Sequence, residues 1–203
     1  DIIDLGLGVF NVDASLIIDK SITIKSSGDG KAQIIYSGEK ETPLFSLQPY
    51  GKLKIEKVIL EGNNNNYLFA TLKKKMSNHF GLTVNYCEIS NFKYALKVYK
   101  QSFAERITFE ATSISNCENG LELSEETNDR GDYNTEYLTI DGCTFNNVEQ
   151  NVVDYYRGGY DESTIGGNLL ITNSTFMNSG ASEENGRLLN HNGIHNVNIN
   201  NNT

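Results

Sequence analysis

The sequence predicts an all-β protein, folded as a right-handed, single-stranded parallel β-helix of about six to seven coils. Two observations predict this fold. Short apolar segments return in one register along the chain, at similar intervals. Each segment carries apolar residues two positions apart, which is the period of a strand with one buried face. No helical periodicity separates the segments, so coils of parallel strands that pair with their neighbours are the natural solution.

Four copies of the repeat define its register, and they start at Leu82, Ile107, Leu138 and Leu169. They read LTVNYCEISN, ITFEATSISN, LTIDGCTFNN and LLITNSTFMN, with apolar residues at offsets 0, 2 and 7. Upstream, LKIEKVILEG from Leu53 keeps these apolar positions, and SITIK at residues 21–25 is the candidate first member. Val197 and Ile199 begin a last copy.

A third apolar slot follows at offset 14, so each coil should contain three short strands. This slot holds Leu96, Leu121 and Val152, and after a five-residue insertion it falls on Leu188. In the same register Asp154 takes an inward-facing position. A carboxylate there needs a partner, because an unpaired buried charge is costly.

Asparagine occupies offset 9 in all four copies, at Asn91, Asn116, Asn147 and Asn178. Asparagine tolerates left-handed backbone geometry, and its amide can bond to an identical amide stacked above it. We therefore expect an asparagine ladder at one corner of the solenoid.

Length and composition fit a single β-helix domain over residues 1–203. Hydrophobic residues make up 38% of the chain, and no apolar run approaches the ~20 residues of a membrane-spanning helix. The net charge of −9 argues against non-specific binding to nucleic acid. Cys87, Cys117 and Cys143 lack the spacing of a zinc site and are interpreted as small core fillers.

The register breaks off inside a coil, since offset 7 of the last copy would fall just beyond Thr203. Solenoids usually end in a cap that covers the last core layer. We therefore expect residues 1–203 to be a fragment of a longer chain.

Charged residues are distributed unevenly. Residues 1–100 carry 13 lysines against 10 acidic residues, and residues 101–203 carry 4 arginines against 16 acidic residues. An anionic partner should therefore prefer the first half, where Lys73–Lys75 with Lys93, Lys97 and Lys100 form either a basic patch or solvated lysines. The acid-rich stretch 122–132 is either a calcium site or a solvated loop, and it lacks the regular spacing of a calcium loop.

Arg157 is the most distinctive candidate residue. Offsets 18 and 19 should stack Lys100, Glu125 and Tyr156 in one column, and Gln101, Glu126 and Arg157 in the next. In a structural interpretation, Arg157 pairs with Glu126 or Asp154 and ties down the loop 158–167. In a functional interpretation, its guanidinium binds a substrate carboxylate while Tyr155, Tyr156 or Tyr160 offers a face to a sugar ring.

Three stretches carry a family resemblance: ALKVYKQSFAERITF, LELSEETNDRGDYNTEYLTIDGCTFNN and VVDYYRGGYDESTIGG, in that order. They resemble the polysaccharide lyase family that contains alginate lyases and chondroitinase B, and in particular its C-terminal β-helix region. The resemblance is densest over residues 95–203. It implies a right-handed β-helix, an exported location, and a parent protein that cleaves a uronate-containing acidic polysaccharide by β-elimination.

The resemblance also implies catalytic machinery that this chain does not carry. In the family, calcium neutralises the uronate carboxylate, a lysine removes the C5 proton and an arginine assists the departing oxygen. The calcium ligands and the lysine stand in a Glu-x-Glu segment with lysine five positions later, and the arginine in an Arg-His-Gly segment. Here Glu39-Lys40-Glu41 is followed by Ser46 at the lysine position, and no Arg-His-Gly occurs. We assign no catalytic residue or metal ligand to this chain, and expect calcium only in the parent enzyme.

Three functional hypotheses follow. In the first, the chain supports a catalytic β-helix domain of the same protein by binding the acidic polysaccharide. Its substrate-binding or loop-ordering residues would then be Lys100, Glu126, Tyr156, Arg157 and Tyr160. In the second, it is a non-catalytic carbohydrate-binding or structural β-helix. In the third, it is an autonomous lyase that uses Arg157 with Lys100 or Tyr156.

Overall fold

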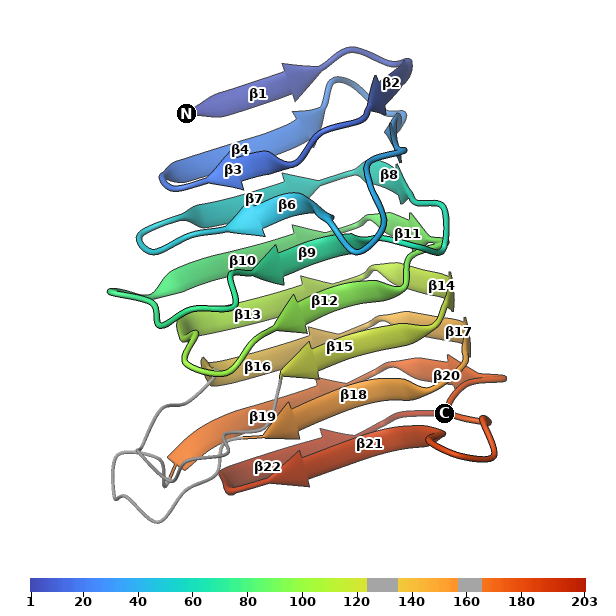
Figure 1. Cartoon of the computed structure of the whole chain (residues 1–203). Coiled ribbons are helices and arrows are strands. Elements are labelled where there is room, and N and C mark those ends of the chain that lie inside the picture. Colours follow the sequence, from blue (N-terminus) through green and yellow to red (C-terminus); the bar gives the residue numbers. More distant parts are fainter. Residues whose placement is uncertain (124–134, 157–165) are drawn as a thin grey trace.

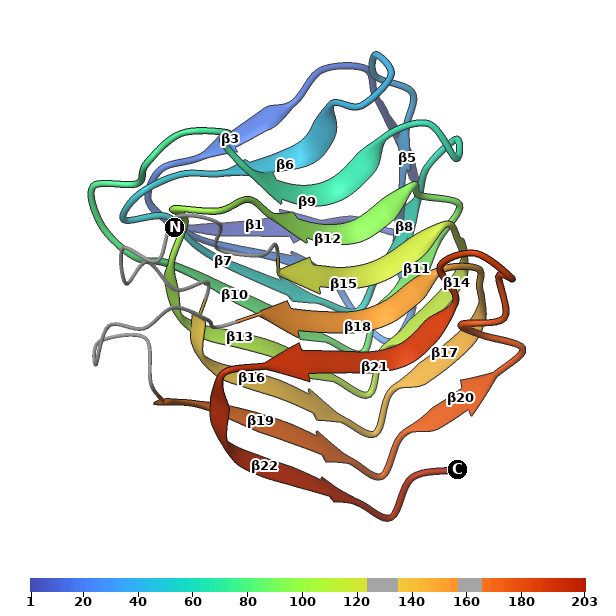
Figure 2. The same cartoon turned by 60° about the horizontal axis from the view of Figure 1, so that its bottom comes forward.

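The computed structural model describes residues 1–123, 135–156 and 166–203, and in these ranges every regular element is a β-strand. The chain passes through three parallel sheets in turn and then returns to the first, one coil further along (Figure 1). Turned by 60°, the same structure shows the three sheets enclosing one core (Figure 2). The predicted all-β solenoid of parallel strands is confirmed. None of the described residues forms a helix that could span a membrane.

The three sheets contain eight, seven and seven strands within the described residues. Sheet A consists of β1 (Ile2–Leu5), β4 (Ser21–Ser26), β7 (Lys52–Glu56), β10 (Phe80–Asn85), β13 (Ala104–Glu110), β16 (Thr135–Asp141), β19 (Gly166–Thr172) and β22 (Ile194–Asn200). Sheet B consists of β2 (Val9–Val12), β5 (Ala32–Tyr36), β8 (Val58–Glu61), β11 (Glu88–Ser90), β14 (Ser113–Cys117), β17 (Thr144–Val148) and β20 (Thr175–Met177). Sheet C consists of β3 (Leu16–Ile18), β6 (Pro43–Leu47), β9 (Tyr67–Thr71), β12 (Tyr94–Val98), β15 (Asn119–Leu123), β18 (Asn151–Tyr156) and β21 (Arg187–Asn192).

The pairing of sheet A confirms the register of the repeat. The residues that start the copies lie side by side on successive strands and are buried, namely Leu53, Leu82, Ile107, Leu138 and Leu169. The structure adds a coil before residues 21–25, which places Ile3 beside Ile24. This first coil has a neighbour on one side only, and Leu7 and Ile17 remain 64% and 65% exposed.

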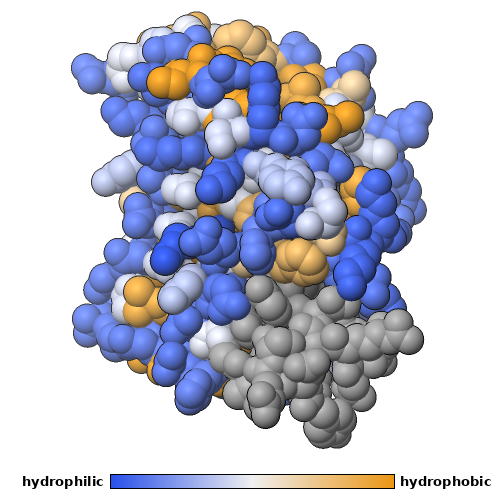
Figure 3. Space-filling view, turned by 90° about the vertical axis from the view of Figure 1, so that its left-hand side faces the viewer, coloured by the Kyte–Doolittle hydropathy of each residue, from blue (hydrophilic) through white to orange (hydrophobic). Residues whose placement is uncertain are grey.

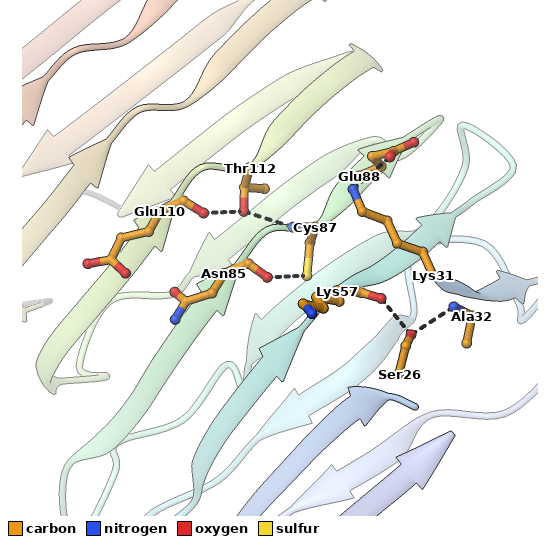
Figure 4. A network of polar contacts seen from close by, with 9 residues as sticks. All are labelled: Ser26, Lys31, Ala32, Lys57, Asn85, Cys87, Glu88, Glu110 and Thr112. Carbon is orange, nitrogen blue, oxygen red and sulfur yellow. Dashed lines mark hydrogen bonds and ion pairs between the residues drawn. The ribbon is translucent and has the colours of Figure 1, made fainter. Parts of the chain in front are cut away.

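The corner between sheets A and B contains a column of hydroxyl and thiol side chains. The Thr112 hydroxyl donates to the Glu110 carbonyl at 2.8 Å and accepts the Cys87 amide of the preceding coil at 3.3 Å (Figure 4). Ser174 accepts the Cys143 amide in the same way, at 3.1 Å. All three cysteines are free and buried, in agreement with their interpretation as core fillers.

The corner between sheets B and C contains the repeated asparagines. All four adopt left-handed backbone geometry, with φ between 49° and 63°: Asn91, Asn116, Asn147 and Asn178. The Asn147 Nδ2 donates to the Asn116 Oδ1 at 2.9 Å, which forms one rung of the expected ladder. The Asn91 and Asn178 amides donate instead to Glu61 and Asn146, at 3.4 and 3.5 Å.

One position of the predicted register in sheet C is wrong. In sheet B, Cys117 pairs with Val148, and in sheet C, Leu121 pairs with Val153. The sequence separation between the paired residues is therefore one residue greater in sheet C than in sheet B. The corner before β18 therefore contains an extra residue, and Val153, not Val152, continues the column. Because successive side chains of a strand alternate in direction, Asp154 lies beside Glu122 on the outer face and does not point into the core.

The same shift of one residue affects the predicted register of the following coil. Val153 pairs with Leu189, so the predicted slot at Leu188 is also off by one position, and Leu188 is 46% exposed. Tyr155 occupies the inward position instead of Asp154. Its ring is fully buried, and its hydroxyl donates to the Thr135 carbonyl at 2.6 Å.

Candidate functional site

One column of residues in register runs along the outer face of sheet C, and all but one of them are polar. Pairing between successive strands aligns Ser46, Ala70, Lys97, Glu122, Asp154 and Asn190. Lys97 projects outward because its neighbours Leu96 and Val98 are buried in the core. On one side of Lys97 the column contains small residues, and on the other it contains two carboxylates.

The Lys97 ammonium contacts the Glu122 carboxylate on the next coil, and the two side chains are 14% and 15% exposed. Asp154 follows one coil further on, and its Oδ1 accepts a hydrogen bond from the Asn190 Nδ2 at 3.1 Å. The site therefore places a mostly buried cation at the end of a short row of acids.

Two tyrosine rings flank Lys97: Tyr94 begins the same strand and Tyr99 follows its end. The Nζ atom lies 4.8 Å from the centre of the Tyr94 ring and 5.7 Å from that of Tyr99. The Tyr67 ring meets the Tyr94 ring edge-on at 5.2 Å, and Lys73 Nζ lies 5.1 Å from the Tyr99 ring. Both contacts are within the range of favourable aromatic and cation–π geometry.

Lys93 joins this surface through a more exposed ion pair. Its Nζ lies 2.8 Å from the Glu41 Oε1, and the two side chains are 24% and 46% exposed. The hydrogen bond and charge of Lys93 lower the pKa of Glu41, and those of Glu41 raise the pKa of Lys93. We call the set Tyr67, Lys73, Lys93, Tyr94, Lys97 and Tyr99 the tyrosine–lysine cluster.

Burial determines the protonation of the central residues of the cluster. It lowers the pKa of Lys97 to about 8, with the charges of Lys73 and Lys93 acting in the same direction and that of Asp154 in the opposite one. Burial also raises the pKa of Tyr67 and of Tyr94 above the ordinary value. The tyrosine hydroxyls therefore stay protonated as donors, while Lys97 can exchange a proton at mildly basic pH.

The structure describes two of the five residues that the sequence analysis proposed for the site. Lys100 is exposed in the loop after β12, and Tyr156 ends β18 opposite Asn192. Because Tyr155 takes the position of Val98, Tyr156 takes that of Tyr99 and not that of Lys100. The predicted column of Lys100 and Tyr156 is therefore wrong. Glu126, Arg157 and Tyr160 lie outside the described residues.

From the sequence, Lys73, Lys93 and Lys97 were predicted only as parts of a possible basic patch. Tyr67, Tyr94 and Tyr99 were not predicted as site residues. The pattern YALKVY at residues 94–99 contains the missed signal. A lysine between buried aliphatic residues must project from the outer face of the strand, and the tyrosines that bound the segment lie within reach of it.

No group of three or more histidine, cysteine, aspartate or glutamate side chains is placed to hold a metal ion in the described ranges. The acid-rich stretch 122–132 is described only as far as Leu123, so most of that candidate calcium site lies outside these ranges.

The cluster adjoins a corner that carries further lysines. Strands of sheet C end there and strands of sheet A begin, and the surface seen at this corner is mainly hydrophilic (Figure 3). Lys73–Lys75 and Lys100 lie in the loops of this corner and are exposed. Cations thus continue from the outer face of sheet C around its edge.

Comparisons with known proteins give matches in structure alone. No family model matches the sequence, and neither does any curated protein. The structure of the PL6 family alginate lyase AlyGC matches with a TM-score of 0.81 and 26% identity. A mutant of the same lyase, with an arginine replaced by alanine, matches with a TM-score of 0.76 and 25% identity.

Both matches cover 91% of this chain but only 27% of the lyase chain. The chain thus spans about a quarter of the length of the lyase that it resembles. The resemblance to the polysaccharide lyase family is confirmed, and within it the likeness is to part of an alginate lyase.

Proposed function

We propose that this chain is a β-helix domain of an alginate-lyase-like protein, and that the tyrosine–lysine cluster binds a uronate-containing acidic polysaccharide. The observation that carries the proposal is the position of Lys97 between the rings of Tyr94 and Tyr99, with Lys73 and Lys93 beside them. The likeness in fold and sequence to an alginate lyase supports this choice of ligand.

The cluster combines the two kinds of contact that an acidic sugar chain needs. Tyrosine rings offer apolar faces for the C–H surface of a sugar ring, and lysines offer charge-assisted hydrogen bonds to its carboxylate. The ammonium groups of Lys73, which is exposed, and of Lys93, which is partly exposed, are the ones that a polymer reaches first. Lys97 is held by Glu122, so its role is to orient the two tyrosines.

Cleavage itself belongs to the parent protein in this proposal. Eliminative cleavage removes the C5 proton of a uronate and breaks the bond between C4 and the departing oxygen. A catalytic β-helix domain of the same chain, with calcium, would supply these steps outside the cytoplasm. The present domain would hold the polymer beside that centre and lengthen the surface on which it lies.

A purely structural β-helix is the alternative, and one observation favours it. Lys97 and Lys93 both have carboxylate partners within the fold, namely Glu122 and Glu41. These ion pairs neutralise the two lysines in the absence of any ligand.

Equilibrium titration separates the two functions. The chain is titrated with polymannuronate, polyguluronate and dermatan sulfate, and with a neutral polysaccharide as a control ligand. We expect Lys73→Gln/Lys93→Gln to weaken binding by about tenfold or more, since two charge-assisted contacts are lost. The matched control is Lys57→Gln, which removes an exposed lysine at the corner between sheets A and B.

Equal binding by all variants, or no binding by the wild-type chain, would contradict the proposal and favour the structural alternative. Ultraviolet absorbance of unsaturated uronate ends is followed in the same samples. Its appearance with this chain alone would show that the domain cleaves the polymer itself.

A further inference from the structure

A groove of about 430 Å³ opens on the outer face of sheet A, at the beginning of its strands. Its lining includes Ser21, Thr23, Lys52, Gly81, Thr83 and Arg106. The register aligns Ser21, Lys52, Gly81 and Arg106 in one outward column. Gly81 has no side chain, so the column is interrupted between the two cations and the groove lies in the gap.

Two features orient Arg106 at the rim of this groove. A β-bulge lies between β10 and β13, where Phe80 pairs with Ala104 but Gly81 pairs with Arg106, so that Glu105 is the extra residue. The Arg106 guanidinium lies over the Tyr137 ring of the next coil, 4.4 Å from its centre. Stacking on a ring leaves the N–H groups at the guanidinium edge available to a ligand.

The charges around the groove differ in whether they are already neutralised. Within the described ranges, Lys52 and Arg106 form no ion pair, whereas Lys54 pairs with Glu56 at 2.9 Å. Of the two acids that line the groove, Asp1 pairs with Lys20 and Glu105 is exposed. Lys52 and Arg106 stand two strands apart, about 10 Å between backbones. That spacing allows both to reach one anionic group held above Gly81.

We propose that this groove is a second saccharide site, which takes one acidic sugar unit with its carboxylate or sulfate between Lys52 and Arg106. The hydroxyls of Ser21, Thr23 and Thr83 line the same groove and offer hydrogen bonds to the sugar hydroxyls. Its volume falls within the range of small-molecule sites. The groove belongs to sheet A and the tyrosine–lysine cluster to sheet C, so the two sites are distinct.

Amide NMR of the ¹⁵N-labelled chain tests the groove without reference to cleavage. The ligands are a short uronate oligosaccharide, a short sulfated oligosaccharide and a neutral oligosaccharide of equal length. We expect both acidic ligands, and not the neutral one, to shift the amide signals of Gly81 and Thr83. Amides of Tyr94 and Lys97 report the tyrosine–lysine cluster in the same spectra.

Variants then assign the binding to the groove. Gly81→Gln fills the gap without changing charge, and a Cβ atom there would meet only Lys52, at 3.5 Å, which is ordinary contact. We expect it to abolish the shifts at Thr83 without lowering the melting temperature, and Lys52→Gln/Arg106→Gln to weaken binding by about tenfold or more. The matched control, Lys25→Gln, removes a cation of sheet A that does not line the groove.

The outcomes distinguish the two sites. Shifts at Tyr94 and Lys97 with none at Gly81 and Thr83 would overturn the groove proposal and leave the proposed function intact. Shifts confined to the groove would support it and count against the cluster. Binding that survives Gly81→Gln, or neutral sugar that binds as well as acidic sugar, would overturn it.

Discussion

The Lys97 ammonium contacts the Glu122 carboxylate across the β12–β15 ladder, and 14% and 15% of the two side chains are exposed. Removing two charges from water is costly, and the loss is recovered only while both partners are present. Asp154 on the next coil depends on the same cation, because its charge acts on Lys97. The stability of this face of sheet C therefore depends on how far the two carboxylates offset the burial of Lys97.

Glu122→Gln should lower the free energy of unfolding by about 3 kcal/mol, because it leaves the Lys97 ammonium buried with only Asp154 to compensate it. Lys97→Met should cost less, since burial already disfavours the charged form of Lys97 and the variant removes that charge. Urea unfolding of both variants and of the double variant measures the coupling between the two residues. A loss below about 0.5 kcal/mol in Glu122→Gln would show that the pair behaves like an exposed one.

The lowered pKa of Lys97 gives stability a specific dependence on pH. Burial sets this pKa at about 8 in the folded chain, below the ordinary 10.5. Above pH 8 the folded chain releases a proton that the unfolded chain still holds, so the unfolded state binds more protons. The free energy of unfolding then rises with pH. Between about pH 8 and 10.5 the wild-type chain should gain stability relative to Lys97→Met.

The absolute stability of both chains is also subject to an opposite effect above about pH 9. Burial raises the pKa of Cys87 and of Cys143 to about 11, above the ordinary 9, so above pH 9 these thiols lower stability as pH rises. Both chains share this effect, and their difference isolates Lys97. Parallel curves for the two chains would mean that Glu122 keeps Lys97 charged throughout.

Ala111 should be a site of stabilisation. It sits at the corner between sheets A and B with φ of 44°, where its coil neighbour is Gly142 with φ of 61°. Left-handed geometry costs an L-residue with a Cβ atom about 1–2 kcal/mol, and glycine avoids most of this. Ala111→Gly should raise the free energy of unfolding by about 0.5–1 kcal/mol.

The control for Ala111→Gly is an exposed alanine outside the left-handed region. Ala181 meets both conditions. Ala181→Gly should be neutral or destabilising, because it only adds freedom to the unfolded chain. Thermal unfolding of both variants compares their melting temperatures. Equal effects would rule out the left-handed backbone geometry of Ala111 as the cause.

The fold followed from the sequence because its determinants are local. Apolar residues two apart define a buried strand face, and their recurrence at Leu53, Leu82 and Ile107 defines the coil. The first coil was not predicted, because its strands have a neighbour on one side only. Its aliphatic residues, such as Leu7 and Ile17, are therefore exposed and carry little pattern.

The site was less predictable because it depends on register between coils. The segment 151–156 has two adjacent buried valines, Val152 and Val153, so alternation alone does not decide which of them continues the column. A single extra residue at the preceding corner turned Asp154 outward. Lys97 and Glu122 lie on different coils, a full repeat apart in sequence, and only the pairing of β12 with β15 brings them into contact.

Glu41→Gln should strengthen the binding of acidic polysaccharide to the tyrosine–lysine cluster. Glu41 lies 2.8 Å from Lys93 and is 46% exposed, so it competes with a ligand carboxylate for the same ammonium group. An exposed ion pair is weak, so its removal should tighten binding only modestly, by about two- to fivefold. The gain should shrink as salt is added, because the contacts are exposed.

The matched control for Glu41→Gln is Glu88→Gln on sheet B. Glu88 is 52% exposed and pairs with Lys31 at 2.7 Å, so the variant removes the same charge from a similar ion pair on another face. Titration of both variants with polymannuronate separates a local effect from one of net charge. A gain confined to Glu41→Gln places the polymer at Lys93. Equal gains would mean that binding depends only on the net charge of the domain. That result would contradict binding of the polymer at the tyrosine–lysine cluster.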